Sequence, residues 1–375
     1  MTKEIVLAAY KRSAFQPAHK GAFTKQRPDD LLAAVINDML RETGVDTNLI
    51  EDVIVGCAFP EAEQGFNIGK IVGQIIGLPQ SVAGCTVNRF CGSSMQAVHN
   101  AAGLILSGAG DCYVIGGIES MTRVPMGGYN PMPNPGLLKT YPQAYISMGE
   151  TAENVGKKHG ITREEQDAFA LKSHEKAASA ASAGKFKDEI VEIAGVSTDG
   201  TIRPESTLET LAGLKPAFDV NGTVTAGSSS PITDGAAAVL VCSLDFAQKH
   251  GLKPLAKIKA MAVAGCAAEM MGLGPVPAVH KVLERAGLSM DDIDIIELNE
   301  AFAAQSLGVI RELNIPLDKL NLDGGAIALG HPLGASGARI TGKAASLLQR
   351  ENKKYALATM CIGGGQGIAT ILERI

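Results

Sequence analysis

Cys91 is the first residue whose surroundings indicate chemistry. It lies in the run Val-Asn-Arg-Phe-Cys-Gly-Ser-Ser over residues 87–94, where a strand-like pattern stops and apolar positions at helical spacing begin. Unpaired N–H groups at a helix N-terminus, together with the helix dipole, stabilise a thiolate and lower the pKa of its thiol. We therefore predict that Cys91 is a nucleophile, although most cysteines are small buried hydrophobic residues.

His331 and Cys361 follow in two glycine-rich segments. His331 lies in a run of small residues over 324–337, which leaves its imidazole open to a ligand. It is a candidate to take a proton from a thiol and then to donate a hydrogen bond to an oxyanion. Cys361 ends a strand-like run, and the glycines after it lack the spacing of a dinucleotide-binding fingerprint.

Asn299 directly follows the strand-like run 293–298. Open α/β sheets present their functional groups at this end of a strand, and a helix N-cap is the structural alternative. The seven His residues form no HxH or HExxH pair, so we expect no metal site.

These residues belong to two similar halves. Residues 30–117 and 279–363 each read as helix, strand, glycine-rich turn, helix and strand, with Cys91 in the first turn and His331 in the second. Apolar strands that alternate with helices predict α/β layers covered on both faces. If the halves pack about a pseudo-twofold axis, their strand ends converge on one site.

The segment between the halves has a different composition. Residues 119–220 are rich in Met and Pro, and a capping box at Thr162 and Glu165 predicts a helix that extends to Ala183. The runs 223–227 and 236–241 are predicted as the last strands of the first unit. The predicted domains are residues 1–118 with 221–250, an inserted loop domain at 119–220, and residues 251–375.

Composition excludes several classes of protein. Of 375 residues, 46% are apolar and only 4% are aromatic. The net charge is −5 and the sequence has no basic cluster, so nucleic acid is not an expected partner. No apolar run approaches the roughly 20 residues of a membrane span. The seven cysteines form no CxxC pair, and the first seven residues are charged and then strand-like, which together predict a cytoplasmic protein.

The four motifs together resemble those of thiolases over essentially the whole chain. They are the nucleophile block 87–94, Asn-Glu-Ala-Phe at 299–302, Gly-His-Pro at 330–332 and Cys-Ile-Gly at 361–363. The nucleophile block, together with residues 271–275, is most similar to bacterial degradative 3-ketoacyl-CoA thiolases. The resemblance implies two pseudo-equivalent α/β domains in a layered αβαβα arrangement, plus an inserted loop domain.

The resemblance also implies a reaction. A 3-ketoacyl-CoA would be cleaved by CoA through an acyl-Cys91 intermediate, with His331 as the base and Cys361 as the proton donor. His331 and a water held by Asn299 would form one oxyanion site, and the N–H groups of Cys91 and Gly363 a second. CoA is a substrate, and no other cofactor is implied. The implied CoA contacts are Arg203, Thr210, Ala226 and Ser230, and the implied acyl pocket draws on Met148, Met271 and Phe302.

The main alternative function is that of a biosynthetic acetoacetyl-CoA thiolase, which condenses two acetyl-CoA molecules. Biosynthetic acetoacetyl-CoA thiolases carry a His before the Met of the Met-Gly-x-Thr-Ala-Glu block, whereas Ser147 precedes Met148 here. A carrier-protein condensing enzyme would have a second His in place of Cys361, and a non-catalytic lipid-binding relative would lack one of the three reactive residues.

The resemblance implies assembly as well. A homodimer or homotetramer is expected, with an apolar edge strand at 82–88 and Arg89 close to the subunit boundary, and a multifunctional β-oxidation subunit is a further partner.

Overall fold

The computed structural model describes residues 3–375; Met1 and Thr2, the start of the segment predicted as strand-like, lie outside the described residues. The strands are β1 (Ile5–Ser13), β2 (Gln16–Pro17), β3 (Asp52–Gly56), β4 (Ala83–Val87), β5 (Cys112–Ser120), β6 (Ile190–Val191), β7 (Thr233–Ser243), β8 (Ala256–Gly265), β9 (Ile295–Leu298), β10 (Tyr355–Ile362) and β11 (Gln366–Glu373). The α-helices are α1 (Pro28–Thr43), α2 (Ile68–Ile75), α3 (Ser93–Ser107), α4 (Pro135–Thr140), α5 (Met148–His159), α6 (Arg163–Ser182), α7 (Leu208–Ala212), α8 (Leu244–Lys249), α9 (Pro275–Ala286), α10 (Ala303–Leu313), α11 (Ala326–Leu329) and α12 (Leu333–Arg350).

The two halves repeat one strand order, as the internal similarity predicted. The first half runs β4-β3-β5-β7-β1, and the second runs β9-β10-β11-β8 with a single parallel bridge from Ile296 to Leu320 where the first half has β4. In each half, a parallel pair (β3 with β5, β9 with β10) is followed by antiparallel neighbours. A short pairing of β1 with β8 joins the halves.

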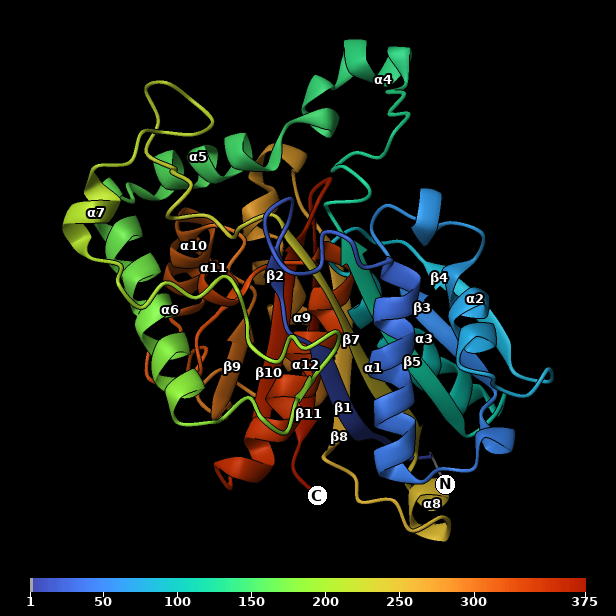
Figure 1. The fold of residues 1–375 in the computed structure, drawn as a ribbon. Coiled ribbons are helices and arrows are strands. Elements are labelled where there is room, and N and C mark those ends of the chain that lie inside the picture. The colour runs from blue at the N-terminus through green and yellow to red at the C-terminus, as the bar shows by residue number, and fades with distance from the viewer. Residues whose placement is uncertain (1–2) are drawn as a thin grey trace.

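Helices α3 and α12 form the middle layer of the fold (Figure 1). They pack against each other and against strands of both halves, while α1 and α2 cover the first half on its other face and α9 covers the second. Almost all of α12 is buried, since it faces neighbours on every side. The α/β layered prediction is therefore confirmed, and the two central helices follow the turns that carry Cys91 and His331.

The segment between the halves lies outside the layers. Its first part, residues 121–147 between β5 and α5, forms the projecting arm that carries α4 (Figure 1), and α5 and α6 then pack against α10 and α11. Helix α6 begins with the predicted capping box of Thr162 and Glu165. The expected strand at 223–227 is wrong: only an isolated bridge from Thr225 to Pro216 forms there, because the strand that completes the first half is β7.

Buried ion pairs link the inserted segment to the layers. Arg12 of β1 is fully buried and donates to both carboxylate oxygens of Asp199, at 2.7 and 2.9 Å, and to Glu189 at 2.8 Å. Glu189 also accepts from Lys343 of α12 at 2.9 Å. A buried charge is tolerated only when it is paired in this way. The network therefore fixes the place where the inserted segment packs against the core.

Within residues 3–375, no helix combines the length and the apolar character that crossing a membrane would require.

Candidate active site

The turn between β4 and α3 presents Cys91. Phe90 takes a left-handed φ of 42°, which is uncommon for a residue with a side chain, and Asn88 Oδ1 stabilises it by accepting from the Phe90 N–H at 2.9 Å. Ser93 closes the turn, because its hydroxyl accepts from Arg89 N and donates to Phe90 O. The sulfur is thereby held at the entry to α3, as the sequence predicted.

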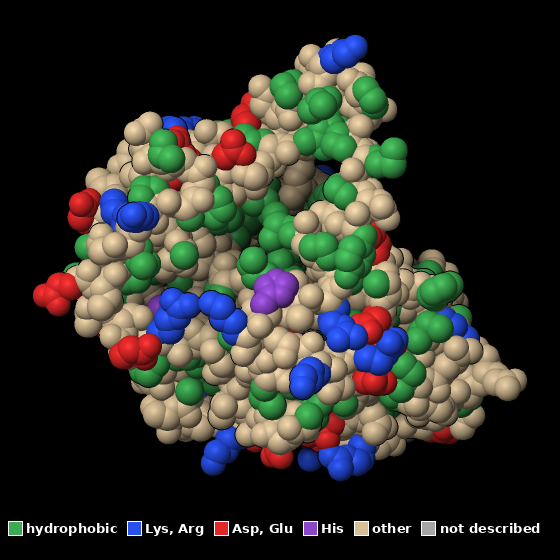
Figure 2. Space-filling model, turned by 45° about the horizontal axis from the view of Figure 1, so that its top comes forward, with side chains coloured by type: hydrophobic (Ala, Val, Ile, Leu, Met, Phe, Trp, Pro, Cys, Tyr) green, Lys and Arg blue, Asp and Glu red, His purple; other side chains and the backbone are tan. Residues whose placement is uncertain are grey.

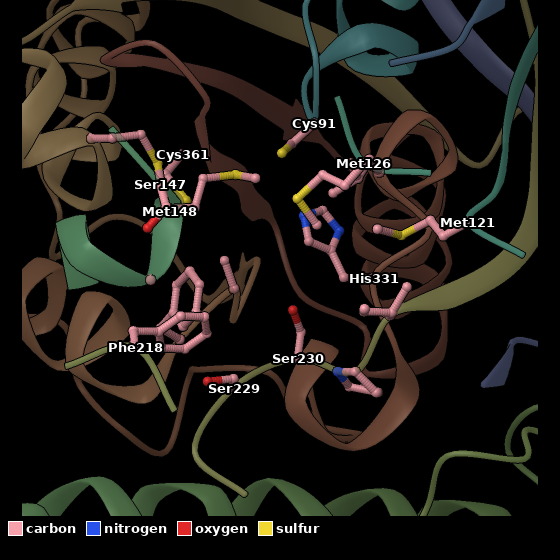
Figure 3. A pocket seen from close by; sticks show the side chains of 17 residues that line it. Cys91, Met121, Met126, Ser147, Met148, Phe218, Ser229, Ser230, His331 and Cys361 are labelled. Carbon is pink, nitrogen blue, oxygen red and sulfur yellow. The ribbon is translucent and has the colours of Figure 1, made fainter. Parts of the chain in front are cut away.

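His331 lies at the corresponding position before α12. Its backbone N–H donates to Thr233 Oγ1 at 3.1 Å, its Nδ1 lies 2.5 Å from Ser336 Oγ, and its Nε2 lies 3.3 Å from Asn299 Nδ2. Only 4% of the residue is exposed. The ring is thus fixed from three directions, and Figure 3 shows the ring and the Cys91 sulfur directed into the same space.

Cys361 and Gly363 come from the end of β10 in the second half. Cys361 is buried and lines the same cavity as Cys91. The backbone N–H groups of Gly363 and of Cys91 itself both stabilise the Cys91 thiolate and so lower its pKa. Gln366 links this loop to the nucleophile turn, since it accepts from Arg89 at 2.7 Å and donates to Gly363 O at 3.3 Å.

Asn299 emerges from the end of β9 and contacts His331. Its backbone N–H donates to Thr359 O of the neighbouring strand, and its Oδ1 is buried with no hydrogen-bond partner among residues 3–375. The alternative role as an N-cap is wrong, because α10 begins later and its N-cap is Phe302. Asn299 is therefore a polar side chain aimed at the site and free of a helix-capping role.

The electrostatic prediction for Cys91 is wrong. Burial raises the pKa of the Cys91 thiol to about 12, and this effect outweighs the two stabilising N–H groups. Burial also lowers the pKa of His331 to about 3, and the nearby Arg339 charge lowers it further. Burial, followed by the neighbouring Cys91, raises the pKa of the Cys361 thiol above its ordinary value. At neutral pH the resting site therefore holds two neutral thiols and a neutral imidazole.

The three residues open onto one apolar cavity of about 220 Å³. Hydrophobic side chains gather around a hollow below the projecting arm in Figure 2. All three residues predicted for the acyl pocket, Met148, Met271 and Phe302, line this cavity. Its other apolar walls were not predicted; they are Met121, Met126, Phe218, Pro231, Ile232, Ala301 and Leu333.

The predicted CoA contacts separate into two groups. Ser230 lines the cavity, whereas Arg203, Thr210 and Ala226 are exposed and lie outside its lining. The Thr210 hydroxyl is engaged in capping α7 with Thr207. As CoA contacts, these four residues remain a prediction.

Two buried carboxylates hold the loops around the site, and sequence reasoning missed both. Glu119, at the end of β5, accepts from the N–H groups of Ala58 and Gly334 and from Gln64, at 2.8 to 2.9 Å, and so joins the first half to the first turn of α12. Glu300 accepts from Ser173 and Asn321 and braces the loop after Asn299. In the sequence, Glu119 is only a charged residue in an apolar strand, and Glu300 lies in the Asn-Glu-Ala-Phe motif without a role assigned to it.

Comparison with known proteins agrees with this architecture. The family model for the thiolase N-terminal domain matches residues 5–245, and that for the thiolase C-terminal domain matches residues 252–374. The chain is 50% identical to a 3-ketoacyl-CoA thiolase of Pseudoalteromonas atlantica over 387 aligned residues, covering 100% of both chains. It is 46% identical to a 3-ketoacyl-CoA thiolase of Bacillus subtilis, covering 99% of both.

A solved structure shows the same fold. The crystal structure of human mitochondrial 3-ketoacyl-CoA thiolase in complex with CoA superposes with a TM-score of 0.92 at 38% identity, covering 100% of this chain and 98% of that one. With two family models that span both halves, full-length relatives and a matching fold, the chain belongs to the thiolase family.

Proposed function

We propose that this chain cleaves a 3-ketoacyl-CoA with CoA, and releases acetyl-CoA and an acyl-CoA shorter by two carbons. One observation carries the proposal: a thiol from the first half and a thiol and an imidazole from the second open onto one buried apolar cavity. The curated relatives bear the name of this activity, which makes the chain an acyltransferase. CoA is a substrate, and the mechanism needs no resident cofactor.

The first half-reaction forms the acyl-enzyme. Cys91 Sγ attacks the 3-keto carbon while its proton passes to His331 Nε2, so that the thiolate exists only as the new bond forms. The carbon–carbon bond then breaks, and its electron pair leaves with acetyl-CoA as an enolate that takes a proton from Cys361. The shortened acyl chain remains on Cys91 as a thioester.

The second half-reaction returns every proton. The CoA thiol gives its proton to the Cys361 thiolate and attacks the thioester carbonyl. The Cys91 sulfur then leaves and recovers its proton from His331. Both thiols and the imidazole regain their neutral resting forms, as ping-pong turnover requires.

Hydrogen-bond donors stabilise the charge that develops on oxygen. The N–H groups of Cys91 and Gly363 are proposed to bind the oxyanion of each tetrahedral intermediate, while His331 and a water held by Asn299 bind the enolate oxygen. The buried, unpartnered Oδ1 of Asn299 supports that second role. Each well-placed donor contributes about 3 kcal/mol to transition-state stabilisation.

We propose a homodimer that pairs through the surface at β4. This strand is the outer strand of the first half, and Phe66, beside it in the loop before α2, is 94% exposed. The arm that carries α4 exposes Met126, Met132 and Leu138, and it offers an apolar surface to a second dimer or to a β-oxidation subunit.

The seven cysteines are all free, which supports a reducing cytoplasmic setting.

The acyl-enzyme provides the direct test of the proposed function. When a 3-ketoacyl-CoA is added without CoA, intact-mass and peptide analysis is expected to show the shortened acyl group on Cys91, with one acetyl-CoA released. Cys91→Ala should abolish both products, because no other thiol occupies the helix entry. Acylation of a different cysteine, or full turnover by Cys91→Ala, would refute the assignment.

Cys361→Ala separates the two thiols by role. This variant should still accept an acyl group from a simple acyl-CoA onto Cys91, because the CoA thiolate is far less basic than a carbanion and can leave without a proton from Cys361. Thiolysis of a 3-ketoacyl-CoA should fall by about 100-fold or more, the lower range of general acid catalysis. If Cys361→Ala forms as much acyl-enzyme as the wild type and also cleaves a 3-ketoacyl-CoA at a near-normal rate, Cys361 has no role in the mechanism.

Phe66→Asp tests the proposed dimer surface. A buried carboxylate at an apolar interface is strongly unfavourable, so mass photometry should show mainly 38.9 kDa monomers in place of dimers. Met132→Asp is the matched control, since Met132 is 91% exposed but lies on the arm. A wild-type chain that is monomeric and fully active, or a dimer unaffected by Phe66→Asp, would contradict the proposal.

A further inference from the structure

We propose that Ser336 is a positioning residue that fixes the tautomer of His331, with the proton on Nδ1 and the free lone pair on Nε2. The inference rests on the proposed role of His331 as the base. It adds a residue that touches neither Cys91 nor the cavity, because Ser336 lies in the first turn of α12 and is absent from the lining residues.

The hydrogen bonds of Ser336 determine where its one proton goes. Ser336 Oγ lies 3.1 Å from Pro332 O, the carbonyl four residues earlier, and 2.5 Å from His331 Nδ1. A carbonyl oxygen can only accept, and a helical serine commonly donates to the carbonyl at this spacing. Pro332 O also accepts from the N–H groups of Ala335 and Ser336. With the hydroxyl proton directed to this carbonyl as well, the hydroxyl oxygen accepts from Nδ1–H.

The opposite side of the ring agrees with this assignment. Asn299 Nδ2 lies 3.3 Å from His331 Nε2, and an amide nitrogen donates. In this orientation of the amide Nε2 is an acceptor, which is the form that can take the Cys91 proton. Had Nε2 carried the proton, the Asn299 amide would have to turn over and present Oδ1 to it.

A hydroxyl suits this site better than a carboxylate. In triads, a buried carboxylate fixes the histidine tautomer and also stabilises its charged form. Among the described residues, no carboxylate hydrogen-bonds to the His331 ring, and Arg339 is the nearby charge that affects it. Ser336 thus fixes the orientation and tautomer of the ring while the ring stays neutral at rest.

Burial makes the contact hard to replace. Ser336 is 1% exposed and His331 is 4% exposed, so bulk water does not reach the Nδ1 side of the ring. Removal of the hydroxyl would leave Nδ1 without a partner. The two neutral tautomers would then compete, and only one of them is a base toward Cys91.

Thr341 provides a matched control in the same helix. Its Oγ1 also donates to the carbonyl four residues earlier, Gly337 O at 2.7 Å, and it is fully buried. It makes no hydrogen bond to His331. Thr341→Val therefore deletes the same kind of helix hydroxyl as Ser336→Ala without changing the contacts of the imidazole.

The test combines a spectroscopic and a kinetic readout. Nitrogen NMR of the protein with ¹⁵N-labelled histidine, with the His331 signals assigned by difference from His331→Gln, reports directly which ring nitrogen is protonated. We expect Nδ1–H in the wild type and in Thr341→Val, and a mixture of tautomers in Ser336→Ala. The kcat of Ser336→Ala should fall about 10-fold, less than the full contribution of a general base, because the reactive tautomer stays populated. The KM for CoA should change by less than twofold, and both constants of Thr341→Val should stay within twofold of wild type.

Two results would overturn the proposal. One is a wild-type His331 protonated on Nε2, a measurement that depends on no variant and on no activity. The other is a folded Ser336→Ala that keeps the Nδ1–H form and a kcat within twofold of wild type. Failure of the proposed function is separate, because it would appear as absent thiolysis in the wild type while the tautomer assignment still holds.

Discussion

The close approach of two helix N-termini, those of α3 and α12, is the constraint on which the site depends. A Cβ on Gly337 of α12 would lie 2.4 Å from the Met95 N of α3, and a Cβ on Gly117 of the strand β5 would lie 2.7 Å both from the Ala335 Cα of α12 and from the Ser94 Cβ of α3. Contacts this short exclude any side chain, so the two helices meet almost backbone to backbone. The residues just before the helices, Cys91 and His331, must then open onto one space even though they belong to different halves.

The same packing determines the electrostatics. Both helices direct the positive ends of their dipoles toward the cavity, and the N–H groups of Cys91 and Gly363 face the Cys91 sulfur; this arrangement favours anions. Burial has the opposite effect on the resting groups, because it raises the pKa of Cys91 to about 12 and lowers that of His331 to about 3. The site is therefore neutral before substrate binds and is preorganised for the negative charge that develops during reaction.

Sequence reasoning could predict the features that depend on local pattern or on the internal repeat. The turn at Cys91, the turn at His331 and the layered α/β fold followed from spacing and from the similarity of the halves. The pKa of Cys91 could not be predicted, because the local pattern reports a helix N-terminus but not how deeply that end is buried.

Other features depend on tertiary contacts that no local pattern records. The arm and the loop at 214–232 fold back over the site, and so Met121, Phe218 and Ile232 become cavity walls. Whether residues 223–227 form a strand depends on which neighbour occupies the sheet, and β7 holds that place. The hydroxyl of Ser336 was visible in the sequence, but only its distance from Nδ1 gives it a role.

The ionisation of Cys91 in the resting enzyme tests this account most directly. Alkylation by iodoacetamide, a neutral reagent, would be followed at the Cys91 peptide by mass spectrometry across pH in the absence of substrate. The account predicts a rate that keeps rising beyond about pH 9, the range in which an ordinary thiol is already largely ionised. A plateau reached below about pH 7 would show a preformed thiolate–imidazolium pair and would contradict the neutral resting site.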